Sequence, residues 1–251
     1  MKVFFHPDFY QVYTSDPAAA AGRMESIVDT ISPHYEFLEP TPAGEEAIAA
    51  VHTSSHIERV RDRGLYNIAA LAAGAAIQAA TAGTKESCFA LIRPPGHHAS
   101  ADSSWGFCFF NNMAIAVEKL RRDEAIEKAI ILDIDLHFGD GTVNIMAKRD
   151  YVSVCNPASN LREDYLDEIT TWLKEQDADV IGISAGFDNH REDWGGLLET
   201  EDYTTIGTMV RERCERRGCG CFALLEGGYN HAVLGTNVLA LLDGMAGKAV
   251  G

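Results

Sequence analysis

The chain has 251 residues, of which 46% are hydrophobic, and it carries a formal net charge of −16. This length and composition suffice for one well-buried core, so we expect a single domain spanning residues 1–251. The acidic charge argues against direct binding of nucleic acid, because neutralising phosphates requires a basic surface. No apolar run is long enough to cross a membrane. The six cysteines follow no regular framework, which predicts reduced thiols and a cytoplasmic location.

Strand-like and helix-like segments alternate along the chain. Short apolar runs typical of buried strands occur at 2–5, 88–92, 129–132, 179–184 and 221–225, and a further strand ends near Val154. Helices are expected over 18–32, 54–63, 65–82, 111–122, 139–149, 162–175, 202–217 and 231–246. Such alternation is typical of a parallel sheet with helices on both faces, so we expect an α/β fold.

Polar side chains follow several of these strands at once. His97 and His98 come after the run at 88–92, and Asp188 and Tyr229 come after the last two runs. Ligands of open parallel sheets bind outside the carboxyl ends of the strands. We therefore expect one edge of the sheet to gather these groups.

The segment 133–140, DIDLHFGD, follows another buried run directly. Side chains alternate in an extended segment, so Asp133, Asp135 and His137 are expected on one face. Three hydrophilic groups at the end of a buried strand are costly unless they are compensated, and a divalent metal would compensate them. With Asp188 as third ligand, Asp135 and His137 suit Zn²⁺ with one position open. The alternative is a polar turn in which Asp140 caps the next helix.

The tandem histidines are better placed as proton-handling groups than as further ligands. A catalytic histidine needs a carboxylate on its far nitrogen, and Asp133 and Asp140 are available to His97 and His98. Tyr229, next to two glycines, can offer a phenol hydrogen bond to a developing oxyanion.

Five ordered motifs carry a family resemblance: 93–99 (RPPGHHA), 106–112 (GFCFFNN), 133–141 (DIDLHFGDG), 184–188 (SAGFD) and 225–229 (LEGGY). Together they resemble the zinc-dependent histone deacetylases, a superfamily with the arginase–deacetylase fold. It also includes acetylpolyamine amidohydrolases and acetoin-utilisation proteins. The resemblance runs from about residue 86 to the end of the chain and is weaker before it.

The resemblance implies a zinc ion held by Asp135, His137 and Asp188, with iron as a possible replacement. It implies that Gly106 and Phe107 bind the substrate as one wall of an acyl-chain tunnel.

The resemblance also implies the catalytic roles. His98, paired with Asp140, would act as general base. His97, paired with Asp133, would stabilise charge and protonate the leaving amine. Tyr229 would polarise the acyl oxygen.

A monovalent cation, usually K⁺, accompanies zinc in this family. The resemblance implies that its ligands are Asp133, backbone oxygens of Asp135 and His137, and Ser153, with a carbonyl from Val154.

The chain is shorter than most family members, and the difference lies in the rim loops. The connection 155–161 is short and carries no aromatic residue, so the second aromatic wall of the tunnel has no counterpart there. We therefore expect a shallow, open site that accepts bulky or varied acyl groups.

The implied function is zinc-dependent removal of acetyl or other acyl groups from an amine, such as an acyl-lysine peptide or an acetylpolyamine. The alternatives are a non-catalytic module that binds zinc or acyl-lysine, and an esterase or thioesterase that uses the same site. An arginase-like enzyme with two manganese ions is disfavoured, because it typically has an aspartate where His190 stands. The motifs do not fix the substrate or the oligomeric state.

Overall fold

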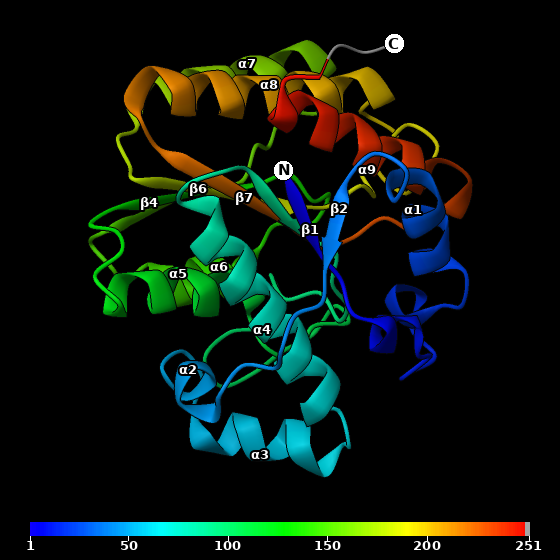
Figure 1. Cartoon of the computed structure of the whole chain (residues 1–251), viewed down its shortest axis with the longest axis vertical. Helices are drawn as coiled ribbons and strands as arrows, with labels where there is room; N and C mark the ends of the chain where they lie inside the picture. Colours follow the sequence, from blue (N-terminus) through cyan, green and yellow to red (C-terminus); the bar gives the residue numbers. More distant parts are fainter. Residues whose placement is uncertain (249–251) are drawn as a thin grey trace.

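Seven parallel strands form a sheet at the centre of the molecule, seen in a computed structural model that describes residues 1–248 (Figure 1). Neighbouring strands follow the order β2-β1-β3-β7-β6-β4-β5, and every pairing is parallel. The strands are β1 (Lys2–Phe4), β2 (Glu36–Leu38), β3 (Cys88–Ala90), β4 (Ala129–Asp133), β5 (Val152–Cys155), β6 (Val180–Ala185) and β7 (Gly220–Leu225).

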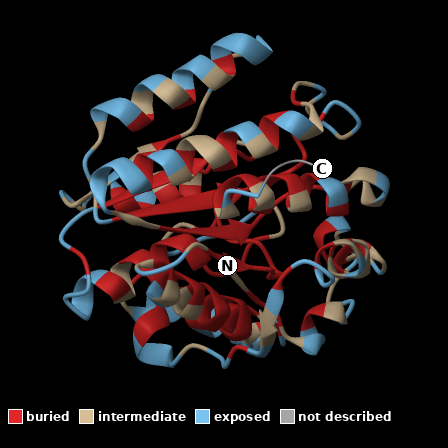
Figure 2. Ribbon diagram, turned by 45° about the horizontal axis from the view of Figure 1, so that its top comes forward, coloured by how far each residue is buried: buried red, intermediate tan, exposed pale blue. Residues whose placement is uncertain are grey.

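Helices cover both faces of this sheet. One layer contains α1 (Arg23–Ile31), α7 (Arg162–Glu175), α8 (Thr200–Arg217) and α9 (His231–Ala246). The opposite layer contains α4 (Tyr66–Gly83), α5 (Asn112–Arg122) and α6 (Asp140–Met146), and the short helices α2 (Glu45–Ala49) and α3 (Ser54–Asp62) pack beside it. Figure 2 shows the buried sheet between two layers of helices whose outer faces are exposed.

The central strands are buried from end to end because helices cover both of their faces. Every residue of β3, β4 and β6 is buried, and in β7 only Gly220 is partly exposed. Such strands are expected to be continuous apolar runs without alternation. The expected parallel α/β fold is confirmed.

Three elements differ from the expectation. The helix expected over 18–32 is split into a short 3₁₀ turn, Pro17–Ala19, and α1. Gly22 causes the break, since its φ of 84° lies in the left-handed region that a continuing helix does not allow. The strand β2 and the helix α2 were not expected, because three and five residues are too few for a periodic pattern.

The order of the strands determines where polar groups meet. β3, β7, β6 and β4 are consecutive neighbours, so the segments that leave their carboxyl ends converge at one edge. Within residues 1–248, no helix is both long and apolar enough to cross a membrane.

Candidate active site

Three potential metal ligands converge at the carboxyl edge of the sheet. Asp135 and His137 lie on the loop after β4, and Asp188 lies on the loop after β6. Their ligand atoms all lie within 4.8 Å of one another. His137 Nδ1 is 3.3 Å from Asp135 Oδ1 and 3.1 Å from Asp188 Oδ2. Within residues 1–248 this is the only such group of three acidic, histidine or cysteine side chains.

The backbone orients both carboxylates of this group. The amide of Gly227 donates to Asp135 Oδ2 at 2.9 Å, and the amide of Leu136 donates to Asp188 Oδ1 at 3.1 Å. The other oxygen of each carboxylate faces His137. Ligands held by such outer partners are pre-oriented for a metal ion.

The electrostatics of the group also fit a cation. Burial, together with the charge of Asp135, raises the pKa of Asp188 to about 6. A divalent ion between the two carboxylates would relieve their repulsion. Two carboxylates and one imidazole are a donor set that Zn²⁺ accepts, so the residues present fit this metal.

His97 and Asp133 form a buried pair beside the ligand group. His97 Nδ1 lies 3.0 Å from Asp133 Oδ2, and its Nε2 faces Asp135 Oδ1 at 3.7 Å. Burial alone would lower the pKa of His97, but the charges of Asp135 and Asp133 outweigh burial and raise this pKa well above its ordinary value. Asp133 is the last residue of β4, where the extended conformation ends. Its carboxylate binds His97, which also faces Asp135. The expectation that Asp133, Asp135 and His137 share one face stays a prediction.

His98 and Asp140 form the second pair. His98 Nδ1 lies 2.7 Å from Asp140 Oδ1, and Asp140 is the first residue of α6. Burial and the neighbouring charge of His97 lower the pKa of His98 to about 4. The two adjacent histidines are thus shifted in opposite directions, a pattern typical of an acid and a base in one site.

Trp105 extends this second pair toward solvent, and no sequence pattern indicated its role. Its indole ring stacks on His98 with centroids 3.8 Å apart, and its Nε1 donates to Asp140 Oδ2 at 2.9 Å. Asp140 thus binds His98 through one oxygen while it accepts the indole hydrogen through the other.

A cavity of about 100 Å³ connects the two histidines with Tyr229. Its lining residues are Pro95, His97, His98, Trp105, Gly106, Phe107, His137, Trp194, Gly227 and Tyr229. Gly106 has a φ of 55°, and a Cβ on it would lie 2.3 Å from His98 Cδ2. Only glycine allows the chain to pass this close to the histidine ring.

Aromatic rings line the cavity on more than one side. Phe107 meets the Tyr229 ring edge-on at 5.9 Å, and Trp194 stacks on Tyr229 at 4.1 Å. The connection 155–161 indeed lacks an aromatic residue, but Trp194 provides an aromatic wall from the loop after β6. The 100 Å³ cavity is well below the roughly 300–1,000 Å³ of typical ligand pockets, so it does not support the expected room for bulky acyl groups. The expected openness of the site stays a prediction.

Tyr229 is fixed by its own backbone. The amides of Tyr229 and Asn230 both donate to Asp193 Oδ2 at 2.8 Å. Burial raises the pKa of Tyr229 well above its ordinary value. The phenol therefore stays protonated and can act as a hydrogen-bond donor in the cavity.

Comparison with known proteins assigns the family. The family model described as Histone deacetylase domain matches residues 62–157 and 158–245. The chain belongs to the histone deacetylase family.

The relatives of this deacetylase come from archaea and bacteria as well as eukaryotes. It is 31% identical to a probable deacetylase of Methanothermobacter thermautotrophicus, over 98% of this chain and 91% of that protein. It is 27% identical to a histone deacetylase-like amidohydrolase of Pseudomonas aeruginosa, over 92% and 79%. It is 31% identical to acetylpolyamine amidohydrolase 1 of the same organism, over 65% and 57%. The HD domain of HDA15 has the same fold, with a TM-score of 0.82 over 100% of this chain and 90% of that one at 21% identity.

Two buried charged residues support the loops of the candidate active site, and both were missed in the sequence. Arg23 Nε donates to the carbonyl of Gly228 at 2.8 Å, and its Nη2 donates to the carbonyl of Glu226 at 2.6 Å. The Glu226 carboxylate accepts the amides of Gly96 and His97 at 2.7 and 3.2 Å. Arg23 therefore holds the tyrosine turn, and Glu226 ties it to the histidine loop. Glu226 could have been found in the sequence, because a charged residue that directly follows a buried strand needs a partner.

The structure places Ser153 away from the site. Ser153 is exposed and pairs with Ile130 in the register of β5 and β4. Asp133 lies three residues further along its strand, about 10 Å away at the usual rise. The residue that pairs beside Asp133, opposite Leu132, is the buried Cys155. Ser153 is therefore not a potassium ligand. The other ligands expected for K⁺, Asp133 and the backbone oxygens of Asp135 and His137, stay predictions.

Proposed function

We propose that this chain is a zinc-dependent deacetylase that hydrolyses the amide between a small acyl group and an amine. The observation that carries the proposal is the meeting, around one cavity of about 100 Å³, of a ligand group, two histidine–aspartate pairs and one tyrosine phenol. The whole chain would work as one catalytic domain.

A zinc ion held by Asp135, His137 and Asp188 would polarise the acyl carbonyl and activate a water molecule. Iron could occupy the same ligands, since carboxylate and imidazole suit it as well.

His98 is proposed as the general base. Its pKa of about 4 leaves the ring neutral near pH 7. Because Nδ1 is engaged with Asp140, Nε2 is the nitrogen left to accept a proton from the attacking water.

His97 and Tyr229 are proposed to handle the charge on the substrate. His97 has a raised pKa and is bound through Nδ1 to Asp133, so it can hold a positive charge and donate a proton to the leaving amine. The Tyr229 phenol would donate a hydrogen bond to the acyl oxygen as negative charge develops there.

The proposed substrates are acetylated amines, either acetyl-lysine peptides or acetylpolyamines. The small cavity favours an acetyl group over bulky acyl groups. Phe107 and Trp194 would lie along the aliphatic chain of the substrate. A chain with a net charge of −16 attracts cationic amines over a distance. The names of relatives that act on acetylpolyamines support this class.

The test is acetate release by the zinc-loaded protein from two panels, acetyl-lysine peptides and acetylpolyamines. Tyr229→Phe is the matched control, because it removes one hydroxyl and keeps the ring that stacks on Trp194. We expect turnover on at least one panel and a loss of about 10²–10³-fold in kcat in the variant, as for removal of one oxyanion donor. Equal turnover by both proteins, or no turnover on either panel with zinc bound, would contradict the proposal.

A further inference from the structure

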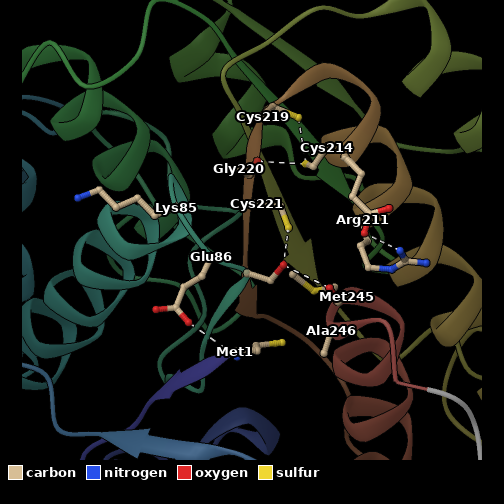
Figure 3. A pocket seen from close by; sticks show the side chains of 12 residues that line it. Met1, Lys85, Glu86, Arg211, Cys214, Cys219, Gly220, Cys221, Met245 and Ala246 are labelled. Atoms are coloured by element: carbon tan, nitrogen blue, oxygen red, sulfur yellow. Dashed lines mark hydrogen bonds and ion pairs between the residues drawn. The ribbon is translucent and has the colours of Figure 1, made fainter.

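A second cavity, of about 360 Å³, lies at the amino end of β7 (Figure 3). The active site follows the opposite end of this strand, and a six-residue strand spans about 20 Å. Sulfur atoms are concentrated around the cavity, whose lining includes Met1, Cys214, Cys219, Cys221 and Met245. Two of these cysteines belong to the CGC segment at 219–221, and the fold places Cys214 beside Cys219.

The end of α8 brings that partner into place. Gly218 follows the helix with a φ of 70°, and the amides of Gly218 and Cys219 donate to the carbonyl of Cys214 at 2.7 and 3.2 Å. The bond from Cys219 to Cys214 is the longer-range bond of a Schellman helix end, in which the second residue beyond the helix packs against a residue of the last turn. Here both positions are cysteines, and their Sγ atoms lie 3.0 Å apart. The backbone of the helix end therefore dictates the contact.

The two thiols differ in exposure and acidity. Cys214 is buried, whereas Cys219 is partly exposed at the cavity. Hydrogen bonding to Cys214 and the charge of Arg213 lower the pKa of Cys219. Hydrogen bonding to the thiols of Cys219 and Cys221, together with burial, raises the pKa of Cys214. A thiol that is both accessible and acidified is the one that attacks a disulfide first.

The third thiol does not turn the pair into a metal site. Cys221 lies inside β7, where its Sγ contacts Ser87 Oγ at 3.2 Å. Among residues 1–248, the only group of three such side chains with ligand atoms within 4.8 Å is the one in the active site. The close contact is thus between Cys214 and Cys219, as the sticks in Figure 3 show.

We propose that Cys214 and Cys219 form a reversible dithiol–disulfide site that reacts with low-molecular-weight disulfides entering this cavity. The Cys219 thiolate attacks one sulfur of the small disulfide, forms a mixed disulfide and releases one small thiol. The Cys214 thiolate then attacks Sγ of Cys219 and releases the second small thiol. The two protein thiols lose two electrons and two protons, and the small disulfide gains both. This site is independent of the deacetylase function proposed above.

The experiment uses the reduced full-length chain and oxidised glutathione as the probe. After an acid quench, we expect the mass of the chain to fall by two hydrogens before alkylation. Alkylation should then label four thiols in place of six. Trypsin separates the cysteines into peptides 214–216 and 218–248, so the bond appears as a cross-linked peptide pair, and fragmentation distinguishes Cys219 from Cys221. Dithiothreitol should restore all six thiols.

Single substitutions test the assignment. Cys214→Ala should stop at a glutathione adduct on Cys219, and Cys219→Ala should keep its remaining thiols free. Cys221→Ala, two residues away, and Cys88→Ala, a buried cysteine on β3, should still form the bond. Six free thiols in the treated wild-type chain, a stable glutathione adduct on that chain, or a bond between Cys214 and Cys221 would each overturn the proposal.

Discussion

The buried part of the active site, here called its floor, and the exposed part, called its rim, are built in opposite ways. On the floor, Asp133 and Asp188 are at most 1% exposed, and each meets a histidine and a backbone amide. At the rim, Trp105 and Trp194 are 55% and 53% exposed. A buried charge without partners is costly, so the floor is constrained on every side. The rim is under no such constraint and can differ between relatives without loss of the fold.

The floor should show the largest effect when a ligand is removed. Asp188→Asn keeps the shape of the side chain and removes its charge. We expect kcat/KM to fall by at least on the order of 10⁴-fold, because activation of water and polarisation of the carbonyl are lost together. Zinc analysis of the purified variant should show less than one ion per chain.

Asp193→Asn is the matched control at the edge of the site. Its carboxylate accepts two backbone amides, and an asparagine oxygen can still accept them, so zinc and most activity should persist. Similar losses of kcat/KM and zinc in Asp188→Asn and Asp193→Asn would contradict the role of Asp188 as a metal ligand.

His98→Ala separates proton transfer from metal binding on the floor. The expected loss in kcat is about 10³-fold, within the range for a general base, while the zinc content stays at the wild-type level. Parallel measurement of kcat and bound zinc checks this. A variant that also loses its zinc would indicate that His98 supports the ligand group instead.

The sequence predicted the floor far better than the rim. The candidate ligands and both histidine–aspartate pairs lie on segments that follow β3, β4 and β6, where β-strand patterns and the order of parallel sheets locate polar groups. Trp105 and Trp194 lie on loops, where an exposed aromatic residue has no periodic pattern that reveals its position.

Other errors arose from long-range geometry. Ser153 was misplaced because the spacing of residues does not give the register of β5 against β4. Arg23 was missed because its partners, Glu226 and Gly228, lie more than 200 residues away along the chain.

The two tryptophans make a matched pair at the rim. Trp105→Phe keeps an aromatic ring near His98 but removes the hydrogen bond to Asp140. Asp140 then becomes more basic and stabilises the protonated ring of His98, which raises the pKa of His98 above about 4. The acidic limb of the kcat/KM profile should therefore move to higher pH by a few tenths of a unit.

Trp194→Phe makes no such change, since Trp194 contacts the Tyr229 and His137 rings and not Asp140. We expect an unchanged acidic limb and a rise of a few-fold in KM, from lost contact with the substrate chain. Identical pH profiles for the two variants would contradict the effect of Trp105, through Asp140, on the pKa of His98.

The smallest expected effect is on the free energy of unfolding, and it comes from His52, which lies beneath the floor of the site. His52 is buried and neutral: its Nδ1 donates to the carbonyl of Ser100 at 3.0 Å, and its Nε2 accepts the amide of Asn111 at 2.9 Å. Burial, together with the neighbouring His56, lowers the pKa of His52 to about 3. In the unfolded chain this histidine takes up a proton below about pH 6.5, whereas in the folded chain it stays neutral. Its contribution to stability is complete above that pH and is lost as the pH falls toward 3.

Urea unfolding at pH 7.5 and 5.5 measures this contribution. We expect the free energy of unfolding of the wild type to fall by roughly 1 kcal/mol more than that of His52→Gln, which cannot titrate. His34→Gln, at an exposed position, serves as control and should keep the wild-type dependence. If His52→Gln shows the same fall as the wild type, protonation of His52 does not limit stability in acid.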